Sequence, residues 1–399
     1  MMGKWLGHGQ IIAYIDFAMK DPALSGHPAP VDFGRAPFLA CWETTQSCGL
    51  ACSHCRADAI LRRDPRELTT EEGKRLLEEA AGMGTPIFIL SGGDPLNRPD
   101  LEELVRHGKR AGLRMGTIPA ATASLTRERI LSLKRAGLDQ MALSLDGPTP
   151  ELHDGFRGVP GSYARTIEGA SLIREAGLPL QINTCFAAWN FQHLEEMVAL
   201  VRRLGVVFWE VFFLVPIGRG QNLQSLSPGQ FEAVFERLHR LNTEESFVIK
   251  LTEAPHYRRF VINKERAAGA EGAAERIRRV LARPRGVGGG LGLSPEAVNA
   301  GKGFVFIDYL GNICPSGFLP IPAGNIRKDS LAAVYRDSPL FKELRDPKLL
   351  KGKCRFCEFA AVCSGSRARA WAMTGDYLAA DPYCAYIPDF DRPTPASAA

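Results

Sequence analysis

The chain has 399 residues, 45% of them hydrophobic, which is enough to bury one large core and a smaller second one. Its 49 basic and 44 acidic residues leave a formal net charge of +5 and form no basic block, so the charge does not indicate a nucleic-acid partner. The longest apolar run, residues 206–217, contains Glu210 and Pro216 and is shorter than the roughly 20 residues needed to span a bilayer.

Residues 1–36 are interpreted as an N-terminal extension that lacks the uninterrupted apolar core and small-residue cleavage site of a signal peptide. We therefore expect a cytoplasmic protein without a membrane span. Thiols stay reduced in that compartment, so the ten cysteines are expected to bind metal rather than to form disulfides. Four cysteines lie between positions 41 and 55 and four between 354 and 384, whereas only Cys185 and Cys314 lie elsewhere.

Short β-rich runs alternate with amphipathic stretches from about residue 36 to residue 250, at the spacing typical of βα units. The predicted strands are Phe38–Thr44, Pro86–Leu90, Arg114–Ile118, Gln140–Leu145, Leu180–Cys185 and Val207–Val215. Six units of this kind predict an α/β fold, a partial (β/α)6 TIM-type barrel whose reactive groups lie at the carboxyl ends of the strands. A flat, doubly wound sheet is the alternative.

The boundaries of several helices are marked by local motifs. Thr69 and Glu72 form a Thr-x-x-Glu capping box, and Pro99-Asp100 suits the first turn of the next helix. Four predicted helices end in basic residues followed by a glycine, which accepts the left-handed conformation at a helix end: Gly112, Gly137, Gly177 and Gly205.

Periodicity weakens after about residue 255, and residues 267–303 are rich in Ala, Arg and Gly. We therefore divide the chain into a barrel domain at 37–250, a linker or insertion at 251–303, a smaller C-terminal domain at 304–390 and a tail at 391–399.

Cys48, Cys52 and Cys55 follow the first predicted strand as a CxxxCxxC motif. Three thiolates within eight residues can surround one face of a 4Fe-4S cluster, which leaves one iron without a protein ligand. A zinc site completed by His54 or a distant cysteine, or a group of buried thiols, is the alternative.

The motif, with the ring of His54 before its last cysteine, resembles that of the radical S-adenosylmethionine (SAM) superfamily. The resemblance implies that the open iron binds the amino and carboxylate groups of SAM. An electron from the cluster would then cleave SAM to methionine and a 5′-deoxyadenosyl radical. No catalytic side chain beyond the cluster ligands is predicted.

Further motifs along the barrel resemble the SAM-binding segments of this superfamily. Ser91-Gly-Gly-Asp-Pro95 resembles its GGEP motif with Asp in place of Glu, and the segment from Ser144 through Asp146 to Arg157 resembles a contact with the SAM ribose and carboxylate. Turns, caps and surface ion pairs are the alternative roles of these residues. The candidate SAM-binding residues are Gly92, Gly93, Asp94, Ser144, Arg157, Asn183 and Val215.

A second cysteine group, in the predicted C-terminal domain, consists of Cys354, Cys357, Cys363 and Cys384. Four thiols can enclose an auxiliary 4Fe-4S cluster with no open iron, and a four-cysteine zinc site is the alternative. The segment resembles the SPASM domain of many radical SAM enzymes, although Arg367 stands where that pattern has a further cysteine. We therefore expect one auxiliary cluster.

The three remaining cysteines are expected to play other roles. Cys314 is a candidate spare ligand or substrate-facing thiol, and a core position is favoured for it. Cys41 and Cys185, which lie on the first and fifth predicted strands, are expected to be hydrophobic residues of the barrel interior.

A narrower resemblance rests on His54-Cys-Arg-Ala57, Pro315-Ser-Gly-Phe-Leu-Pro320 and the stretch from Cys363 to Ala370. These motifs resemble the branch that includes alternative heme and heme d1 biosynthesis enzymes, which remove carboxylates or side chains from iron porphyrins. The resemblance implies a tetrapyrrole substrate and an electron donor such as flavodoxin or ferredoxin. His256, Arg258 and Arg259 are candidate substrate contacts, and a solvated helix face is the alternative.

Two other functions remain open at this point. A peptide maturase that forms a crosslink or thioether on a ribosomally made precursor would use the same cofactors. A non-catalytic iron-sulfur electron carrier would need neither the open iron nor Gly92, Gly93 and Asp94.

Overall fold

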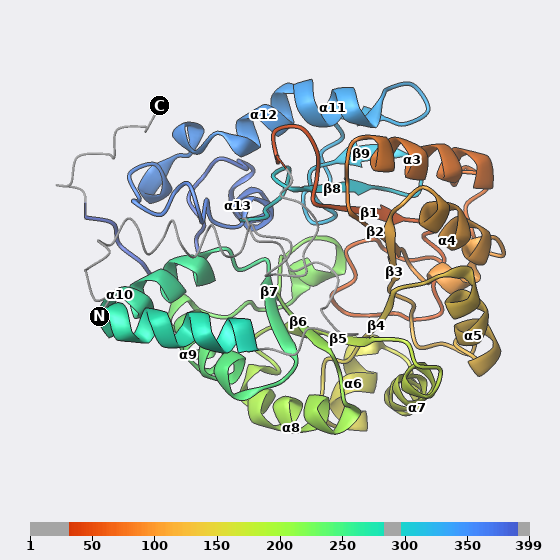
Figure 1. The fold of residues 1–399 in the computed structure, drawn as a ribbon, viewed down its shortest axis with the longest axis horizontal. Coiled ribbons are helices and arrows are strands. Elements are labelled where there is room, and N and C mark those ends of the chain that lie inside the picture. Colours follow the sequence, from red (N-terminus) through yellow and green to blue (C-terminus); the bar gives the residue numbers. More distant parts are fainter. Residues whose placement is uncertain (1–31, 283–296, 390–399) are drawn as a thin grey trace, which may run out of the picture.

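The computed structural model describes residues 32–282 and 297–389. Its centre is one ten-stranded sheet in the order β10-β9-β8-β1-β2-β3-β4-β5-β6-β7 (Figure 1). The strands are β1 (Leu39–Glu43), β2 (Ile87–Ser91), β3 (Arg114–Thr117), β4 (Gln140–Ser144), β5 (Leu180–Phe186), β6 (Phe208–Phe213), β7 (Val248–Thr252), β8 (Phe304–Ile307), β9 (Asn312–Cys314) and β10 (Gly324–Asn325).

The sheet is a partial barrel, as predicted. Strands β1 to β6 pair in chain order and in parallel, and Figure 1 shows the sheet curving from β1 to β7 with helices along its outer side. A doubly wound sheet would reverse its strand order at a switch point, and this sheet has no such reversal between β1 and β7. All six predicted strands lie within two residues of the observed ones.

The helices follow the strands along the outer face. They are α3 (Thr70–Gly82), α4 (Leu101–Arg110), α5 (Arg127–Ala136), α6 (Pro150–Arg157), α7 (Ser162–Glu175), α8 (Leu194–Leu204), α9 (Pro228–Glu244), α10 (His256–Ala282), α11 (Leu331–Asp337), α12 (Pro339–Arg345) and α13 (Arg367–Thr374). Thr69 and Glu72 form the predicted capping box of α3. The four predicted terminal glycines have positive φ angles: 92° at Gly112, 101° at Gly137, 67° at Gly177 and 62° at Gly205.

Side chains alternate between the two faces of the sheet. On β1, Ala40 and Trp42 are fully buried in the large core against the outer helices. Cys41 and Glu43 point to the opposite, inner face, because successive residues of a strand face opposite sides. The same alternation places Trp209 in the outer core and Glu210 on the inner face of β6. The inner face therefore carries polar groups, whereas the outer face is apolar.

The structure differs from the predicted division of the chain in two places. The segment 251–303, predicted as a linker, contains the end of β7 and the helix α10. Strand β8, from the predicted C-terminal domain, pairs in parallel with β1, so the sheet continues across the predicted boundary. Neither β7 nor β8 was predicted, because an Ala-rich, Arg-rich stretch separates these short β-rich runs and they show no periodic pattern. Residues 1–31, 283–296 and 390–399 lie outside the described residues.

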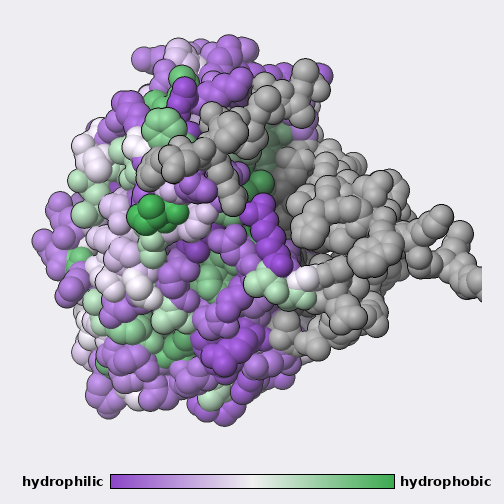
Figure 2. Space-filling model, turned by 90° about the vertical axis from the view of Figure 1, so that its left-hand side faces the viewer, coloured by the Kyte–Doolittle hydropathy of each residue, from purple (hydrophilic) through white to green (hydrophobic). Residues whose placement is uncertain are grey.

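Over the part of the chain that the structure describes, no helix is both long and apolar enough to cross a membrane. Figure 2 shows one side of the molecule, on which hydrophilic residues predominate and hydrophobic ones are scattered.

Candidate functional site

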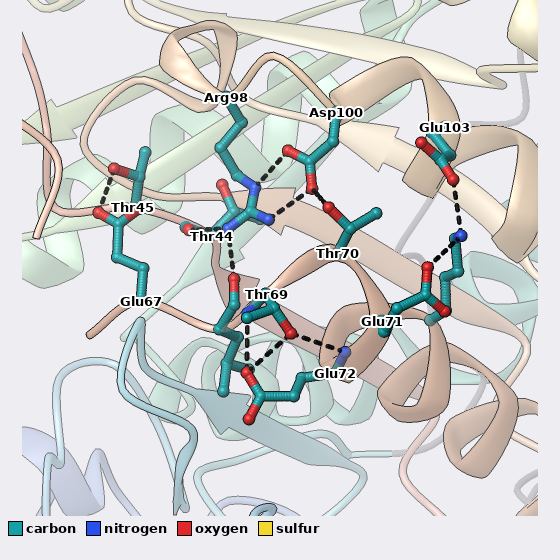
Figure 3. Close-up of polar contacts among 12 residues, drawn as sticks. Thr44, Thr45, Glu67, Thr69, Thr70, Glu71, Glu72, Arg98, Asp100 and Glu103 are labelled. Atoms are coloured by element: carbon teal, nitrogen blue, oxygen red, sulfur yellow. Dashed lines mark hydrogen bonds and ion pairs between the residues drawn. The ribbon is translucent and has the colours of Figure 1, made fainter. Parts of the chain in front are cut away.

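Arg98 fixes the end of β1, where the first cysteine loop begins (Figure 3). Its side chain is 1% exposed and donates hydrogen bonds to the carbonyl oxygens of Thr44 at 2.9 Å and Leu68 at 3.0 Å. It also forms a two-pronged ion pair with Asp100, at 3.0 and 2.6 Å. Asp100 precedes α4 as predicted, but its carboxylate binds Arg98 instead of capping the helix. The first cysteine loop therefore begins at a residue, Thr44, whose carbonyl group is held by a buried hydrogen bond.

The three cysteines of the CxxxCxxC motif lie together on the loop after β1. Cys48 and Cys52 are buried, Cys55 is half-buried, and all three are free thiols in one small cluster with Leu50. Burial raises the pKa of Cys48 to about 12, so the thiolate form needs a neighbouring positive charge. Three adjacent thiols on a loop fit the donor set of an iron-sulfur cluster with one open iron.

The glycine pair lies directly beneath this loop. The amide of Gly93 donates to the carbonyl oxygen of Thr45 and that of Asp94 to the carbonyl oxygen of Ser47, both at 2.7 Å. A Cβ atom at Gly93 would lie 2.4 Å from the Ser47 carbonyl oxygen, so only glycine permits this approach. The Asp94 carboxylate is buried, which raises its pKa, and it accepts hydrogen bonds from Thr122 at 2.8 Å and from the Leu96 amide at 3.1 Å.

A buried ion pair connects the cysteine loop to β4. Arg157, at the end of α6, pairs with Asp146, and its Nη1 lies 3.5 Å from the Cys52 sulfur. Burial opposes ionisation of Asp146, yet the charge of Arg157 holds its pKa below the usual value. The carboxylate also accepts a 2.8 Å hydrogen bond from the Cys185 amide. A fixed positive charge therefore lies beside one thiol of the first cysteine group.

The other predicted SAM-binding residues lie on or directly after neighbouring strands, with Asn183 in the middle of β5. Ser144 ends β4 and is paired in register with Asn183 of β5, whose side-chain oxygen accepts a 2.6 Å hydrogen bond from Gln181. Val215 is buried after β6. The structure thus brings segments that follow five different strands toward one end of the sheet, as the barrel predicts.

Two features of this end were not predicted. Arg219 clamps the cysteine loop, since its amide donates to the Cys55 carbonyl oxygen at 3.0 Å and its Nε to that of Cys52 at 2.8 Å. On the inner face, Glu210 accepts hydrogen bonds from Gln181 at 2.8 Å, Lys250 at 2.8 Å and Thr252 at 2.6 Å. A charged residue inside the apolar run 206–217 was the sequence feature that indicated this network.

The second cysteine group also comes together. Cys354, Cys357, Cys363 and Cys384 line one pocket, although Cys384 is separated from Cys363 by α13. Burial raises the pKa of Cys363 to about 12 and that of Cys357 to about 11. Four free thiols around one pocket fit the donor set of an auxiliary cluster. In the described ranges, no three or more His, Cys, Asp and Glu side chains are arranged around a position for a single metal ion.

The other cysteines lie apart from this pocket. Cys314 is 2% exposed on β9 and pairs in register with Phe306 of β8, which agrees with a core position. Cys41 and Cys185 lie on β1 and β5, where burial raises the pKa of Cys41 to about 12.

The structure places His256, Arg258 and Arg259, the predicted substrate contacts, beside the second cysteine group. His256 is fully buried and lines the second cysteine pocket together with Arg259. Arg259 pairs with Glu232, and Arg258 donates to the carbonyl oxygen of Val298 at 2.8 Å. These residues form the first turn of α10, and sequence alone did not distinguish a substrate contact from a position beside the second cysteine group.

Comparison with known proteins agrees with this geometry. Residues 42–201 match the Radical SAM superfamily model. The AdoMet-dependent heme synthase of Methanosarcina barkeri is 40% identical over 89% of this chain and 98% of its own length, and that of Oleidesulfovibrio alaskensis is 36% identical over 90% and 89%. The PqqA peptide cyclase of Ruegeria pomeroyi is 30% identical over 93% of each chain.

Among solved structures, Streptococcus suis SuiB bound to S-adenosylmethionine has a TM-score of 0.67 at 16% identity, covering 88% of this chain and 78% of its own. The structure anSMEcpe with bound AdoMet has a TM-score of 0.62 at 16% identity, covering 87% and 93%. At these identities the likeness concerns the fold. Together with the cysteine loop and the partial barrel, the sequence relatives show that the chain is an enzyme that belongs to the radical SAM superfamily.

Proposed function

We propose that this enzyme removes carboxylate groups from the propionate side chains of an iron porphyrin. One observation carries the proposal: the similarity to an AdoMet-dependent heme synthase covers 89% of this chain and 98% of the relative, at 40% identity. The relatives named PqqA peptide cyclase reach 29 to 31%. The shared sequence therefore extends beyond the SAM-binding half, which all of these enzymes need.

Cys48, Cys52 and Cys55 would hold the SAM-binding 4Fe-4S cluster, which together with SAM supplies a radical able to remove a hydrogen atom. Gly93 keeps the backbone of the neighbouring loop close to the cysteines, and Arg219 fixes the carbonyl groups of Cys52 and Cys55. Arg157 places a positive charge 3.5 Å from the Cys52 sulfur, which offsets part of the thiolate charge. Ser144 and Asn183, on β4 and β5, are the candidate polar contacts of SAM.

The inner face of the sheet suits a substrate with several carboxylates. Arg56 lies 4.4 Å over the ring of Phe306 and pairs with Glu43 at 3.1 Å. Lys250 pairs with Glu210 at 2.8 Å on the other side of the barrel. Carboxylates of an anionic macrocycle would compete with Glu43 and Glu210 for these two cations.

The proposed reaction releases an electron that needs an acceptor. Loss of one hydrogen atom and of CO2 from an ionised propionate leaves a vinyl group and one electron. We assign the acceptor role to the auxiliary 4Fe-4S cluster that Cys354, Cys357, Cys363 and Cys384 would hold.

The test is turnover of the anaerobically reconstituted enzyme with SAM, a strong reductant and an iron porphyrin that carries propionates. We expect 5′-deoxyadenosine and a porphyrin product that has lost CO2 and two hydrogen atoms per reacted propionic acid, measured by mass spectrometry. The porphyrin methyl ester is the matched control, because it cannot lose CO2 in this way. Absence of product from the free acid, in protein with full iron content, would contradict the proposal.

Similarity to PqqA peptide cyclases supports a second candidate, the modification of a peptide. The same assay distinguishes the two functions. An enzyme that acts on peptides leaves the porphyrin unchanged, and its formation of 5′-deoxyadenosine does not respond to the porphyrin.

A further inference from the structure

The pocket of the second cysteine group contains buried hydrogen-bond donors that lack an acceptor. Among the described residues, neither ring nitrogen of His256 has a hydrogen-bond partner, and the side chain is 0% exposed. The Nε of Arg259 is also buried without a partner, although its terminal nitrogens bind Glu232. Both residues line the same pocket as the four cysteines. A buried donor without an acceptor is unfavourable, so an acceptor in this pocket would remove a penalty.

The nearby carboxylate does not serve as this acceptor. Asp381 Oδ2 lies 3.8 Å from His256 Nδ1, which is too long for a hydrogen bond. Asp381 already accepts hydrogen bonds from Arg369 at 3.1 Å, from the Ser366 amide at 2.8 Å and from the Tyr383 amide at 3.1 Å. The Asp381 carboxylate is therefore already used by Arg369 of α13 and by backbone amides beside this helix.

His256 is held in place by packing alone. Its ring centroid lies 5.0 Å from that of Phe231 and 4.8 Å from that of Phe235. Burial lowers its pKa to about 3, so the ring is neutral at physiological pH and carries one N–H. A neutral ring fixed between two aromatic rings is suited to donate one hydrogen bond in a fixed direction.

Positive charge surrounds the same cysteines. Lys353 Nζ donates to the Cys384 carbonyl oxygen at 2.5 Å. Arg367 is fully buried on α13, where its Nη2 has no hydrogen-bond partner within the described part of the chain. The charge of Arg258 opposes the effect of burial on the Cys363 thiol. The group that these cysteines hold is thus placed among cations.

We infer that His256 and Arg259 donate hydrogen bonds to sulfur atoms of the iron-sulfur cluster held by Cys354, Cys357, Cys363 and Cys384, and thereby raise its reduction potential. The inference rests on the auxiliary cluster of the proposed function. Reduction adds one negative charge to the cluster, and hydrogen bonds to its sulfur atoms stabilise the reduced form more than the oxidised form. These residues are positioning residues, because they act through the cluster and do not contact substrate.

The test is the midpoint potential of this cluster in the full-length chain, followed by EPR in the Cys48→Ala, Cys52→Ala, Cys55→Ala background so that only one cluster contributes. At a fixed applied potential, we expect His256→Phe to lower the ratio of reduced to oxidised cluster at least tenfold. This corresponds to a midpoint potential about 59 mV lower for a one-electron couple. His256→Gln keeps a donor and should restore a potential near that of the parent. His239→Phe is the matched control, because His239 of α9 contacts Phe260 of α10 and does not line the pocket.

The outcomes separate this inference from the proposed function. If replacing Cys354, Cys357, Cys363 and Cys384 together by Ala leaves the iron content unchanged, the C-terminal cluster itself is absent, and the electron-acceptor role fails with the inference. If the cluster is present but His256→Phe and Arg259→Lys both leave its potential unchanged, only the inference fails. If His256→Phe does not fold, Arg259→Lys decides, because equal potentials in the parent and in Arg259→Lys overturn the inference.

Discussion

The two cysteine regions are held by different means. Around Cys48, Cys52 and Cys55, main-chain groups are paired with one another: the amide of Cys48 donates to Ile60, that of Ala51 to Arg157 and that of Ser53 to Phe156, at 2.8 to 3.0 Å. Around the C-terminal cysteines the backbone is paired as well, for example from the amide of Cys363 to Phe359 at 2.8 Å, but among the described residues both ring nitrogens of the buried His256 lack a hydrogen-bond partner. We propose that the first region is built for position, which the open iron and the bound cosubstrate of the proposed function require. The second would be built for charge, which the proposed electron acceptor requires.

The largest effect is expected from variants that cannot hold the first cluster. Replacing Cys48, Cys52 and Cys55 together by Ala should abolish formation of 5′-deoxyadenosine and lower the iron content by about four per chain, since three thiolates of one cluster are lost. Product chromatography and iron analysis measure both quantities. Cys314→Ala is the matched control, because Cys314 is a buried thiol of β9 outside both groups, and it should keep both. Retained SAM cleavage in the triple variant would disprove the assignment of the first region.

The next effect concerns the ion pair that connects the first region to the barrel. Arg157→Met leaves the buried carboxylate of Asp146 without its cation, which is expected to lower the free energy of unfolding by about 3–5 kcal/mol. Urea denaturation at neutral pH measures this loss. Arg157→Lys, which keeps the charge but loses the second guanidinium nitrogen beside the Cys52 sulfur, should lose less.

The pH dependence of the same pair has a defined sign. The folded-state pKa of Asp146 is lowered, so its stabilisation is present above the unfolded-state pKa of about 3.9 and is lost as the pH falls through the folded-state pKa. Part of the acid sensitivity of the parent should therefore be missing in Arg157→Met. Equal free energies of unfolding of parent and Arg157→Met at neutral pH would show that the ion pair does not stabilise the fold.

Much of the first region was predictable because its parts are local in sequence. The six strands, the capping box and the terminal glycines each depend on a few neighbouring residues, so the sequence predicts them directly. Because these strands run parallel, the segments after β1, β2 and β4 lie at the same end of the sheet. Arg219 and the Glu210 network escaped prediction, because their partners come from loops and strands that only tertiary packing brings together.

The second region was less predictable for the same reason. The spacing of the cysteines indicated a site, but His256 reaches it from α10, about one hundred residues earlier in the chain. A histidine beside two arginines has the same sequence pattern whether it lies on a substrate surface or in a buried pocket. Likewise, β7 and β8 are short strands that flank the six predicted ones and pair with β6 and β1, a pairing that only the folded sheet reveals.

The smallest expected effect tests whether the backbone of the first region is as tightly fitted as its hydrogen bonds suggest. Gly218 and Gly375 both adopt the left-handed conformation, with φ angles of 52° and 75°. A Cβ atom at Gly218 would lie 2.5 Å from the Cys55 carbonyl oxygen, whereas one at Gly375 would meet nothing within 4 Å.

Gly375→Ala should therefore cost only the conformational penalty of about 1–2 kcal/mol and leave SAM binding unchanged. Gly218→Ala carries the same penalty and must also displace the carbonyl group of a cluster ligand, so it should weaken SAM binding as well. Thermal unfolding and SAM titration of the two variants measure the difference. Equal SAM affinity in both variants would mean that the cysteine loop adjusts freely, and the contrast between a position-built and a charge-built region would then lose its structural basis.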